Sequence, residues 1–448
     1  MIGTAVEASA AIARGDVSPA ELTEQLLDRI WATEPALHAY FAVTAERARA
    51  RARELTDELC AGSTRGPLHG LPVGVKDIVD TAGIRTTYGS PRFADHVPIR
   101  DAAAVARWRD AGVVVLGKHA THELAWGGRT DSAFYGPTHN PYRAGRIPGG
   151  SSGGSAASVT VGSSLGSIGS DTAGSVRIPA ALSGCVGIKP SRGRIPMHGV
   201  LPLAPSLDHL GVLARTVEDA ELLLGGLADP LSAAAVPALR VGWLGGWFGA
   251  VQSGDVAAAL ATTRGLLEDG GVRIDDVIVG DEPLMPAAVL TRIHTEAAAS
   301  HRAAFEADPS LFGADIATLL RMPTSPAGQV AACDAAIGRF AVAINHALAT
   351  HDVLVSATVP IAAPRIGATS VAVDGHDWPV ELLLTRHTSI VNAIGLPAAS
   401  VPVALAEGLP VGLQIVAGAS RDDVVLNAAR LVEQLVPRLP APDRFSAP

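Results

Sequence analysis

The sequence predicts an α/β protein with a substantially parallel sheet. Residues 101–111 have the spacing of a helix that stops at Gly112, and residues 113–116 form a short apolar run typical of a buried strand. Residues 71–79 form a similar run, rich in β-branched residues, upstream of that helix. Strands and helices that alternate along the chain favour a sheet covered by helices.

The first 60 residues are predicted to be helical. Ser18 and Glu21 have the spacing of a capping box, with Pro19 at the first helical position and an apolar face of leucines behind it. Residues 45–59 continue as a helix rich in Ala, Arg and Glu.

Later elements follow from the same patterns. Thr216 caps a helix that runs through Leu224, residues 228–239 are predicted to be a connector, and residues 290–349 form one long helical region. The other expected elements are strands near 241, 277, 353–355, 399–403 and 411–416, and helices from about 256 and from 421.

Composition excludes several classes of protein. The 448 residues are 48% hydrophobic and carry a net charge of -9, which suits a sizeable core and disfavours nucleic-acid binding. The three cysteines are far apart, so a disulfide framework is not expected. We found neither a leader-like segment nor a membrane span, and expect a cytoplasmic protein.

Lysine is rare in this chain. Only Lys76, Lys118 and Lys189 are lysines among 35 basic residues. Lys76 lies in the apolar run 71–78, where loss of water lowers the pKa of an amine toward 7. The run therefore suggests a buried general base, and the alternative is a salt bridge to a distant carboxylate.

Two segments rich in small residues are candidates for a reacting site. Residues 148–157 read PGGSSGGSAA, in which glycines allow close backbone approach and serines supply hydroxyls; the alternative is a flexible linker. Residues 169–179 read GSDTAGSVRIP, a turn whose N–H groups could converge on a developing oxyanion. Asp171 and Arg177 could pair and brace that turn.

Several familiar motifs are only partly matched. Residues 112–118 have the spacing of a P-loop, but His119 occupies the position that needs Ser or Thr. The two G-x-S-x-G matches at 149–153 and 162–166 are not supported as nucleophile elbows. His119, His122 and Glu123 lack the spacing of a zinc site because Trp126 occupies the second histidine position. Neither a metal nor a cofactor is expected.

The candidate segments together resemble the amidase signature family of serine amidohydrolases. The resemblance rests on residues 149–157, on residues 171–179 and on the upstream lysine. It continues through residues 187–190, 206–208, 395–398 and 408–414. It implies an amidase-signature fold, in which a large twisted mixed sheet is flanked by helices on both faces.

The resemblance also implies one domain over 1–448. This domain would have a helical segment at 1–60, a core with the active site at 68–215, and a more variable, substrate-shaping part at 240–390.

The resemblance implies a catalytic triad of two serines and a lysine. Ser175 would attack the amide carbonyl, and Lys76 would be the general base. Ser151, joined to Gly150 by a cis peptide bond, would relay the proton between them. The oxyanion hole would comprise the N–H groups of Thr172, Ala173, Gly174 and Ser175. The residues expected to support these loops are Gly150, Ser152, Ser155, Asp171 and Arg177.

The family usually has glycine where this chain has Ala173. The Ala173 N–H can still serve in the oxyanion hole if the backbone φ is negative, but the methyl group of Ala173 could narrow the acyl pocket. The pocket is expected to be lined from residues 126–135, 197–203 and 290–390, with Trp126, Tyr135 and Arg177 as candidate substrate contacts.

The expected function is hydrolysis of a small carboxylic amide to an acid and ammonia or an amine. The alternatives are the glutamine-hydrolysing A subunit of the tRNA-dependent amidotransferase, a ureido amidohydrolase of the biuret or allophanate type, and a non-catalytic binding protein. The expected partner is a small amide, without nucleic acid or membrane, and the resemblance leaves a homodimer open.

Overall fold

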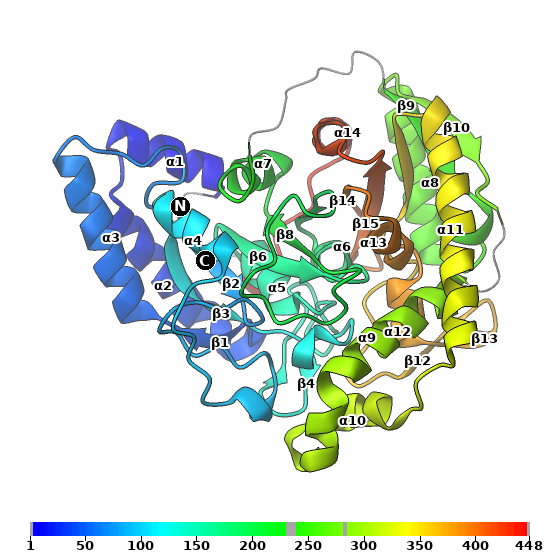
Figure 1. Cartoon of the computed structure of the whole chain (residues 1–448). Helices are drawn as coiled ribbons and strands as arrows, with labels where there is room; N and C mark the ends of the chain where they lie inside the picture. Colours follow the sequence, from blue (N-terminus) through cyan, green and yellow to red (C-terminus); the bar gives the residue numbers. More distant parts are fainter. Residues whose placement is uncertain (1–2, 230–238, 281–284, 446–448) are drawn as a thin grey trace.

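A computed structural model describes residues 3–229, 239–280 and 285–445 (Figure 1). Its centre is an 11-stranded sheet in the order β1-β3-β2-β6-β8-β7-β14-β15-β11-β9-β10. The strands of this sheet are β1 (Tyr40–Val43), β2 (Pro72–Lys76), β3 (Val114–His119), β6 (Gly166–Asp171), β7 (Val186–Lys189), β8 (His209–Ala214), β9 (Arg240–Leu244), β10 (Arg273–Val277), β11 (Val353–Ala357), β14 (Ala398–Ala406) and β15 (Leu409–Ala417). Two small hairpins pair β4 (Asp131–Ser132) with β5 (Gly136–Pro137) and β12 (Ser370–Val373) with β13 (His376–Pro379).

The helices connect these strands and cover the sheet. They are α1 (Ala5–Arg14), α2 (Pro19–Leu37), α3 (Ala45–Cys60), α4 (Ala103–Asp110), α5 (Gly153–Val161), α6 (Arg177–Ser183), α7 (Val217–Gly225), α8 (Gly254–Asp269), α9 (Met285–Ala307), α10 (Ala314–Arg321), α11 (Ala327–Thr350), α12 (Val380–Thr385), α13 (Ser389–Ile394) and α14 (Asp422–Leu435). The predicted capping boundaries are confirmed at Ser18, whose side chain bonds Glu21 in a capping box, and at Thr216, which caps α7.

The two faces of β6 meet different helices. A Cβ atom at Gly166 would lie 2.1 Å from Leu223 of α7, whereas one at Gly169 would lie 2.9 Å from Ser152, next to α5. Because side chains alternate along a strand, α7 and α5 cover opposite faces. Figure 1 likewise draws α7 and α14 above the central strands and α5 below them. The prediction of a mixed sheet with helices on both faces is confirmed.

The prediction of a substantially parallel sheet is wrong. Parallel pairs occur toward the two ends of the sheet, in β3-β2-β6 and β11-β9-β10, and the central pairs from β6 to β11 are antiparallel. One reason is the β14–β15 hairpin, whose two-residue turn consists of Glu407 and Gly408. Both have positive φ, which suits the tight turn between antiparallel strands.

The predicted long helical region at 290–349 is three helices. Asp308 caps a short 3-10 turn that begins at Pro309, and Pro323 and Pro326 separate α10 from α11. Proline ends a helix because it lacks the N–H and clashes with the preceding turn. The predicted connector at 228–239 lies mostly outside the described residues, since 230–238 are not among them.

One helix in the described part of the chain, α11, has the length and hydropathy to cross a membrane. Core helices of water-soluble proteins meet the same test. One face of α11, which includes Ile337, Phe340 and Ile344, is buried, and the helix packs against α9 and α13.

Candidate active site

Lys76 is the last residue of β2 and is fully buried. Its Nζ atom donates hydrogen bonds to Ser151 Oγ at 2.7 Å and to Ser170 Oγ at 2.8 Å. Burial lowers the pKa of Lys76 from 10.5 to about 7, against the opposing negative charges of Asp171 and Asp208. The amine is therefore poised to exchange a proton near neutral pH.

Ser151 sits where the glycine-rich segment enters α5. The Gly150–Ser151 peptide bond is cis, and a Cβ atom at Gly150 would lie 2.8 Å from the backbone nitrogen of Arg129. Only glycine fits so close to that backbone. The segment is buried rather than a flexible linker, and it fixes the Ser151 hydroxyl beside Lys76.

Ser175 follows the sharp turn after β6. It is 7% exposed and lines a large cavity that opens above it. The Ser152 N–H donates to the Ser175 carbonyl oxygen at 3.2 Å, which ties the two serine-bearing segments together. Within the described part of the chain, the Ser151 and Ser175 hydroxyls are not hydrogen-bonded to each other.

The turn before Ser175 presents several free N–H groups. Those of Thr172, Ala173 and Ser175 make no hydrogen bond within the described residues, whereas the Gly174 N–H donates to Asp171 Oδ1 at 2.8 Å. The expectation that Gly174 contributes an N–H to the oxyanion hole stays a prediction, and this N–H would have to leave Asp171 to fulfil it. Ala173 is not among the described non-glycine residues with positive φ. The backbone conformation that its N–H needs to serve in the oxyanion hole is therefore present.

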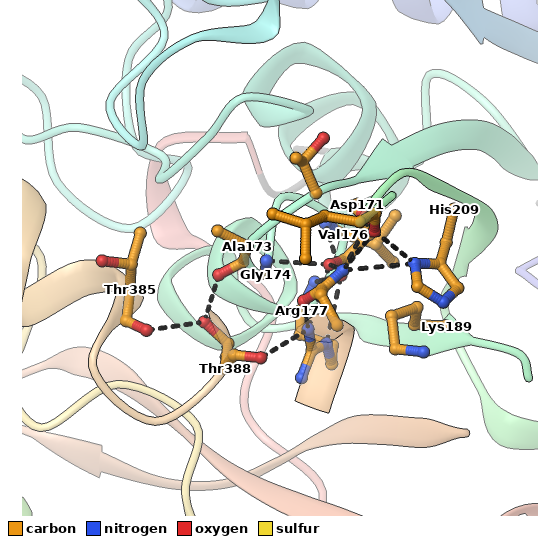
Figure 2. A network of polar contacts seen from close by, with 12 residues as sticks. Asp171, Ala173, Gly174, Val176, Arg177, Lys189, His209, Thr385 and Thr388 are labelled. Carbon is orange, nitrogen blue, oxygen red and sulfur yellow. Dashed lines mark hydrogen bonds and ion pairs between the residues drawn. The ribbon is translucent and has the colours of Figure 1, made fainter. Parts of the chain in front are cut away.

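The backbone conformation and the close packing at Gly174 require glycine. Its φ is +122°, and a Cβ atom there would lie 2.2 Å from Thr388 Oγ1. The Thr388 hydroxyl donates to the Ala173 carbonyl oxygen at 2.5 Å. The Ala173–Gly174 peptide is thus held at its carbonyl by Thr388 and at its N–H by Asp171, as Figure 2 shows.

Arg177 and Asp171 form the predicted pair, and both are fully buried. The guanidinium contacts the carboxylate through two nitrogens, at 3.0 and 3.1 Å. Burial alone would raise the pKa of Asp171, but the charge of Arg177 outweighs it and holds that pKa below its usual range. Arg177 also bonds the side chains of Asn392 and Gln414, each at 2.6 Å. It is therefore a brace and not a substrate contact.

Ser152 and Ser155 also lie where loop support was expected. The Ser152 hydroxyl donates to the Ser170 carbonyl oxygen at 3.2 Å. Ser155 accepts a hydrogen bond from Ser167, whose hydroxyl also contacts His119 at 2.9 Å. These contacts attach α5 to β6 behind the turn.

All three lysines are fully buried. Lys118 contacts the Val79 carbonyl oxygen and the Thr81 and Thr86 hydroxyls, and Lys189 contacts the carbonyl oxygens of Pro190 and Leu396. These two bind loop backbones together. Lys76 differs because both of its hydrogen bonds go to serine hydroxyls.

His122 and Glu123 serve separate partners. His122 contacts Asp315 at 2.9 Å, and Glu123 accepts from the Ser90 hydroxyl at 2.7 Å. In the described ranges, no cluster of three or more His, Cys, Asp or Glu side chains is arranged to hold a metal ion.

A cavity of about 660 Å³ opens above Ser175. Its apolar wall includes Trp126, Leu203 and residues of α9 and α10, and its polar lining includes Arg129, Asp315 and Glu381. Trp126 therefore lies where a substrate contact was expected, as do parts of 197–203 and 290–390. Tyr135 is not among the described lining residues, because its ring packs against Phe41 at 4.8 Å.

Four polar residues around the site were not predicted from the sequence. Ser170 binds Lys76, and Thr388, Asn392 and Gln414 hold the turn. Ser170 has a signal in the sequence, since it adjoins Asp171 at the end of the strand beside β2. The other three come from distant segments and have no local signal.

The fold matches that of enzymes that hydrolyse amide carbon–nitrogen bonds. A crystal structure of an amidase superposes with a TM-score of 0.92 at 32% sequence identity, over 97% of this chain and all of the other. The family model described as Amidase matches residues 21–426, and the chain belongs to this family.

The curated relatives carry a more specific name. The A subunit of glutamyl-tRNA(Gln) amidotransferase from Roseiflexus castenholzii is 34% identical over 470 residues, covering 95% of this chain and 94% of the relative. The protein of the same name from Oleidesulfovibrio alaskensis is 34% identical and covers 98% of both chains. The crystal structure of the corresponding protein from Thermotoga maritima has a TM-score of 0.78 at 27% identity, over 95% of this chain and 94% of that one.

Proposed function

We propose that this enzyme hydrolyses a small carboxylic amide through an acyl-enzyme on Ser175. The observation that carries the proposal is the 2.7 Å contact between Ser151 Oγ and the amine of a fully buried lysine. A hydroxyl becomes a useful nucleophile only when a base removes its proton, and lysine is a base only when uncharged.

In the proposed acylation, the Ser175 oxygen attacks the amide carbon. The Ser175 proton passes to Ser151 as the Ser151 proton passes to neutral Lys76. The relay requires Ser175 Oγ to approach Ser151 Oγ in the substrate complex, where such contacts tighten. The carbonyl oxygen becomes an oxyanion, which the free N–H groups of Thr172, Ala173 and Ser175 would stabilise.

Collapse of this intermediate breaks the carbon–nitrogen bond. Lys76 returns its proton by way of Ser151 to the leaving nitrogen, which departs as ammonia or an amine. A water molecule then attacks the acyl group, gives up a proton to the same relay, and releases the acid. Ser175 regains its proton, so the cycle consumes one amide and one water.

A fluorophosphonate probe tests the nucleophile. It should label the wild-type enzyme and the control Ser300→Ala, which changes an exposed serine on α9, but not Ser175→Ala. Amide hydrolysis should fall about 10⁴-fold in Ser175→Ala and stay at the wild-type rate in the control. Undiminished hydrolysis by Ser175→Ala would refute the proposal.

The second candidate is the glutamine-hydrolysing component of a tRNA-dependent amidotransferase. The names of the curated relatives support it more strongly than they support a stand-alone amidase. The amidase structure, with the higher TM-score, supports the stand-alone enzyme. Both candidates use the same proposed chemistry at Ser175 and differ in substrate and partners.

A further inference from the structure

The cavity above Ser175 has two chemically different parts. Side chains of Trp126, Leu203, Leu290, Ile293 and Leu319 form an apolar wall. The second part is a group of charged residues that we call the Arg129 cluster: His122, Arg129, Asp131, Asp315 and Glu381. All of these except Asp131 line the cavity.

Carboxylates outnumber cations in the Arg129 cluster. The Arg129 guanidinium lies 3.0 Å from Glu381, 3.4 Å from Asp315 and 3.6 Å from Asp131. His122 lies between two of the same carboxylates, 2.9 Å from Asp315 and 3.6 Å from Asp131. Three carboxylates thus surround one guanidinium and one imidazole, so the cluster has no net positive charge.

A substrate carboxylate would meet no cation in the described cavity lining that does not already face carboxylates. Arg129 is the only arginine or lysine among the described residues that line the cavity, and all three lysines are fully buried outside that lining. Arg129 is only 14% exposed and faces three acidic neighbours. A buried carboxylate without its own cationic partner is strongly unfavourable, and nearby like charges add to that cost.

We infer that the site selects amides of uncharged, mainly apolar acids and rejects amides that carry a carboxylate on the acyl chain, glutamine included. The inference rests on the proposed function, because it concerns the substrate of the same nucleophile. The apolar wall would hold the acyl chain, and Glu381 and Asp315 would keep Arg129 from attracting an anion.

Two amides of equal shape test this inference. 5-Methylhexanamide and 4-carbamoylbutanoate have the same chain, but the first ends in two methyl groups and the second in a carboxylate. Ammonia release should give a kcat/KM at least about 100-fold higher for 5-methylhexanamide, from the cost of an unpaired buried charge. Glutamine should be as poor a substrate as 4-carbamoylbutanoate.

Glu381→Gln tests the role of the Arg129 cluster. The amide oxygen can still accept the Gly128 N–H, now 2.8 Å from Glu381, but the variant removes one charge beside Arg129. The preference for 5-methylhexanamide should shrink about tenfold, mainly through a gain for 4-carbamoylbutanoate. The control Glu268→Gln removes an exposed carboxylate on α8, which pairs with Arg264, and should leave the preference unchanged.

The possible outcomes separate the inference from the proposed function. If the enzyme prefers glutamine or 4-carbamoylbutanoate, and Ser175→Ala abolishes their hydrolysis, the inference is overturned. The assignment of Ser175 as the nucleophile would then still hold. An unchanged preference in Glu381→Gln would overturn the role of the Arg129 cluster. Calorimetric binding of both amides to Ser175→Ala gives the same comparison without turnover, and equal affinities there would also overturn the inference.

Discussion

The Lys76 amine leaves water without gaining an ion-pair partner among the described residues, since its two hydrogen bonds go to neutral hydroxyls. A change in pKa from 10.5 to about 7 corresponds to about 4–5 kcal/mol between the two protonation states. Between these two pKa values the unfolded chain holds more protons on Lys76 than the folded chain, so this residue's cost to stability lessens as pH rises. The burial of this amine thus comes at the expense of stability.

The lowered pKa of Lys76 predicts a pH profile for catalysis. Only the neutral amine can accept the proton, so kcat/KM for 5-methylhexanamide should rise with pH through about 7 and fall about tenfold per unit below it. Steady-state rates between pH 5 and 9 measure this. Lys76→Ala should lose about 10⁴-fold in activity, and a wild-type optimum on the acid side would contradict the assignment.

At the scale of residues, local composition pointed to Lys76 and to the two small-residue segments, and the resemblance to the amidase signature family implied Ser151 and Ser175 within them. The expected pair of Asp171 and Arg177 is present. Thr388 could not be predicted in this way, because it contacts Ala173 across 215 positions of sequence. The direction of the Gly174 N–H toward Asp171 likewise could not be read from local composition.

At the scale of elements, the start of α5 is packed against backbone. A Cβ atom at Gly154 would lie 2.3 Å from the Ala39 carbonyl oxygen and 2.5 Å from the Ala120 nitrogen. Neither atom is the end of a flexible side chain, so an added methyl group must displace the helix that follows Ser151.

Gly154→Ala should therefore destabilise the protein by about 1–3 kcal/mol, although alanine favours helix. The matched control is Gly265→Ala within α8, where a Cβ atom would meet nothing within 4 Å. That control should stabilise by about 0.4–1 kcal/mol. Thermal unfolding of both variants measures the difference, and equal shifts in Tm would contradict the close packing of α5.

Patterns of capping and apolar spacing predicted most helices and the later strands, because these signals lie within one element. The division of residues 290–349 into three helices was not predicted, although the sequence contains Pro309, Pro323 and Pro326 there. The mixed order of the sheet could not be derived from the helix–strand rhythm, since pairs such as β7–β14 join segments about 200 residues apart.

At the scale of the whole molecule, one sheet contains strands from both halves of the sequence, and the cavity is lined by residues from 122 to 385. The chain therefore supplies the proposed nucleophile, the proposed base and the described walls of the cavity.

We predict that the purified chain releases ammonia from 5-methylhexanamide without any partner protein, because the site is built from one chain. Adding the other subunits of a tRNA-dependent amidotransferase should not change the rate per active site. Light scattering during size-exclusion chromatography would show which assembly carries the activity. Glutamine hydrolysis that appears only with those subunits would favour the second candidate function.

The burial of every lysine also affects how the protein can be handled. Reagents that acylate or cross-link primary amines should find no accessible lysine ε-amine on the folded chain. New reactivity toward such reagents would then report unfolding, because Lys76, Lys118 and Lys189 become accessible only when the chain opens.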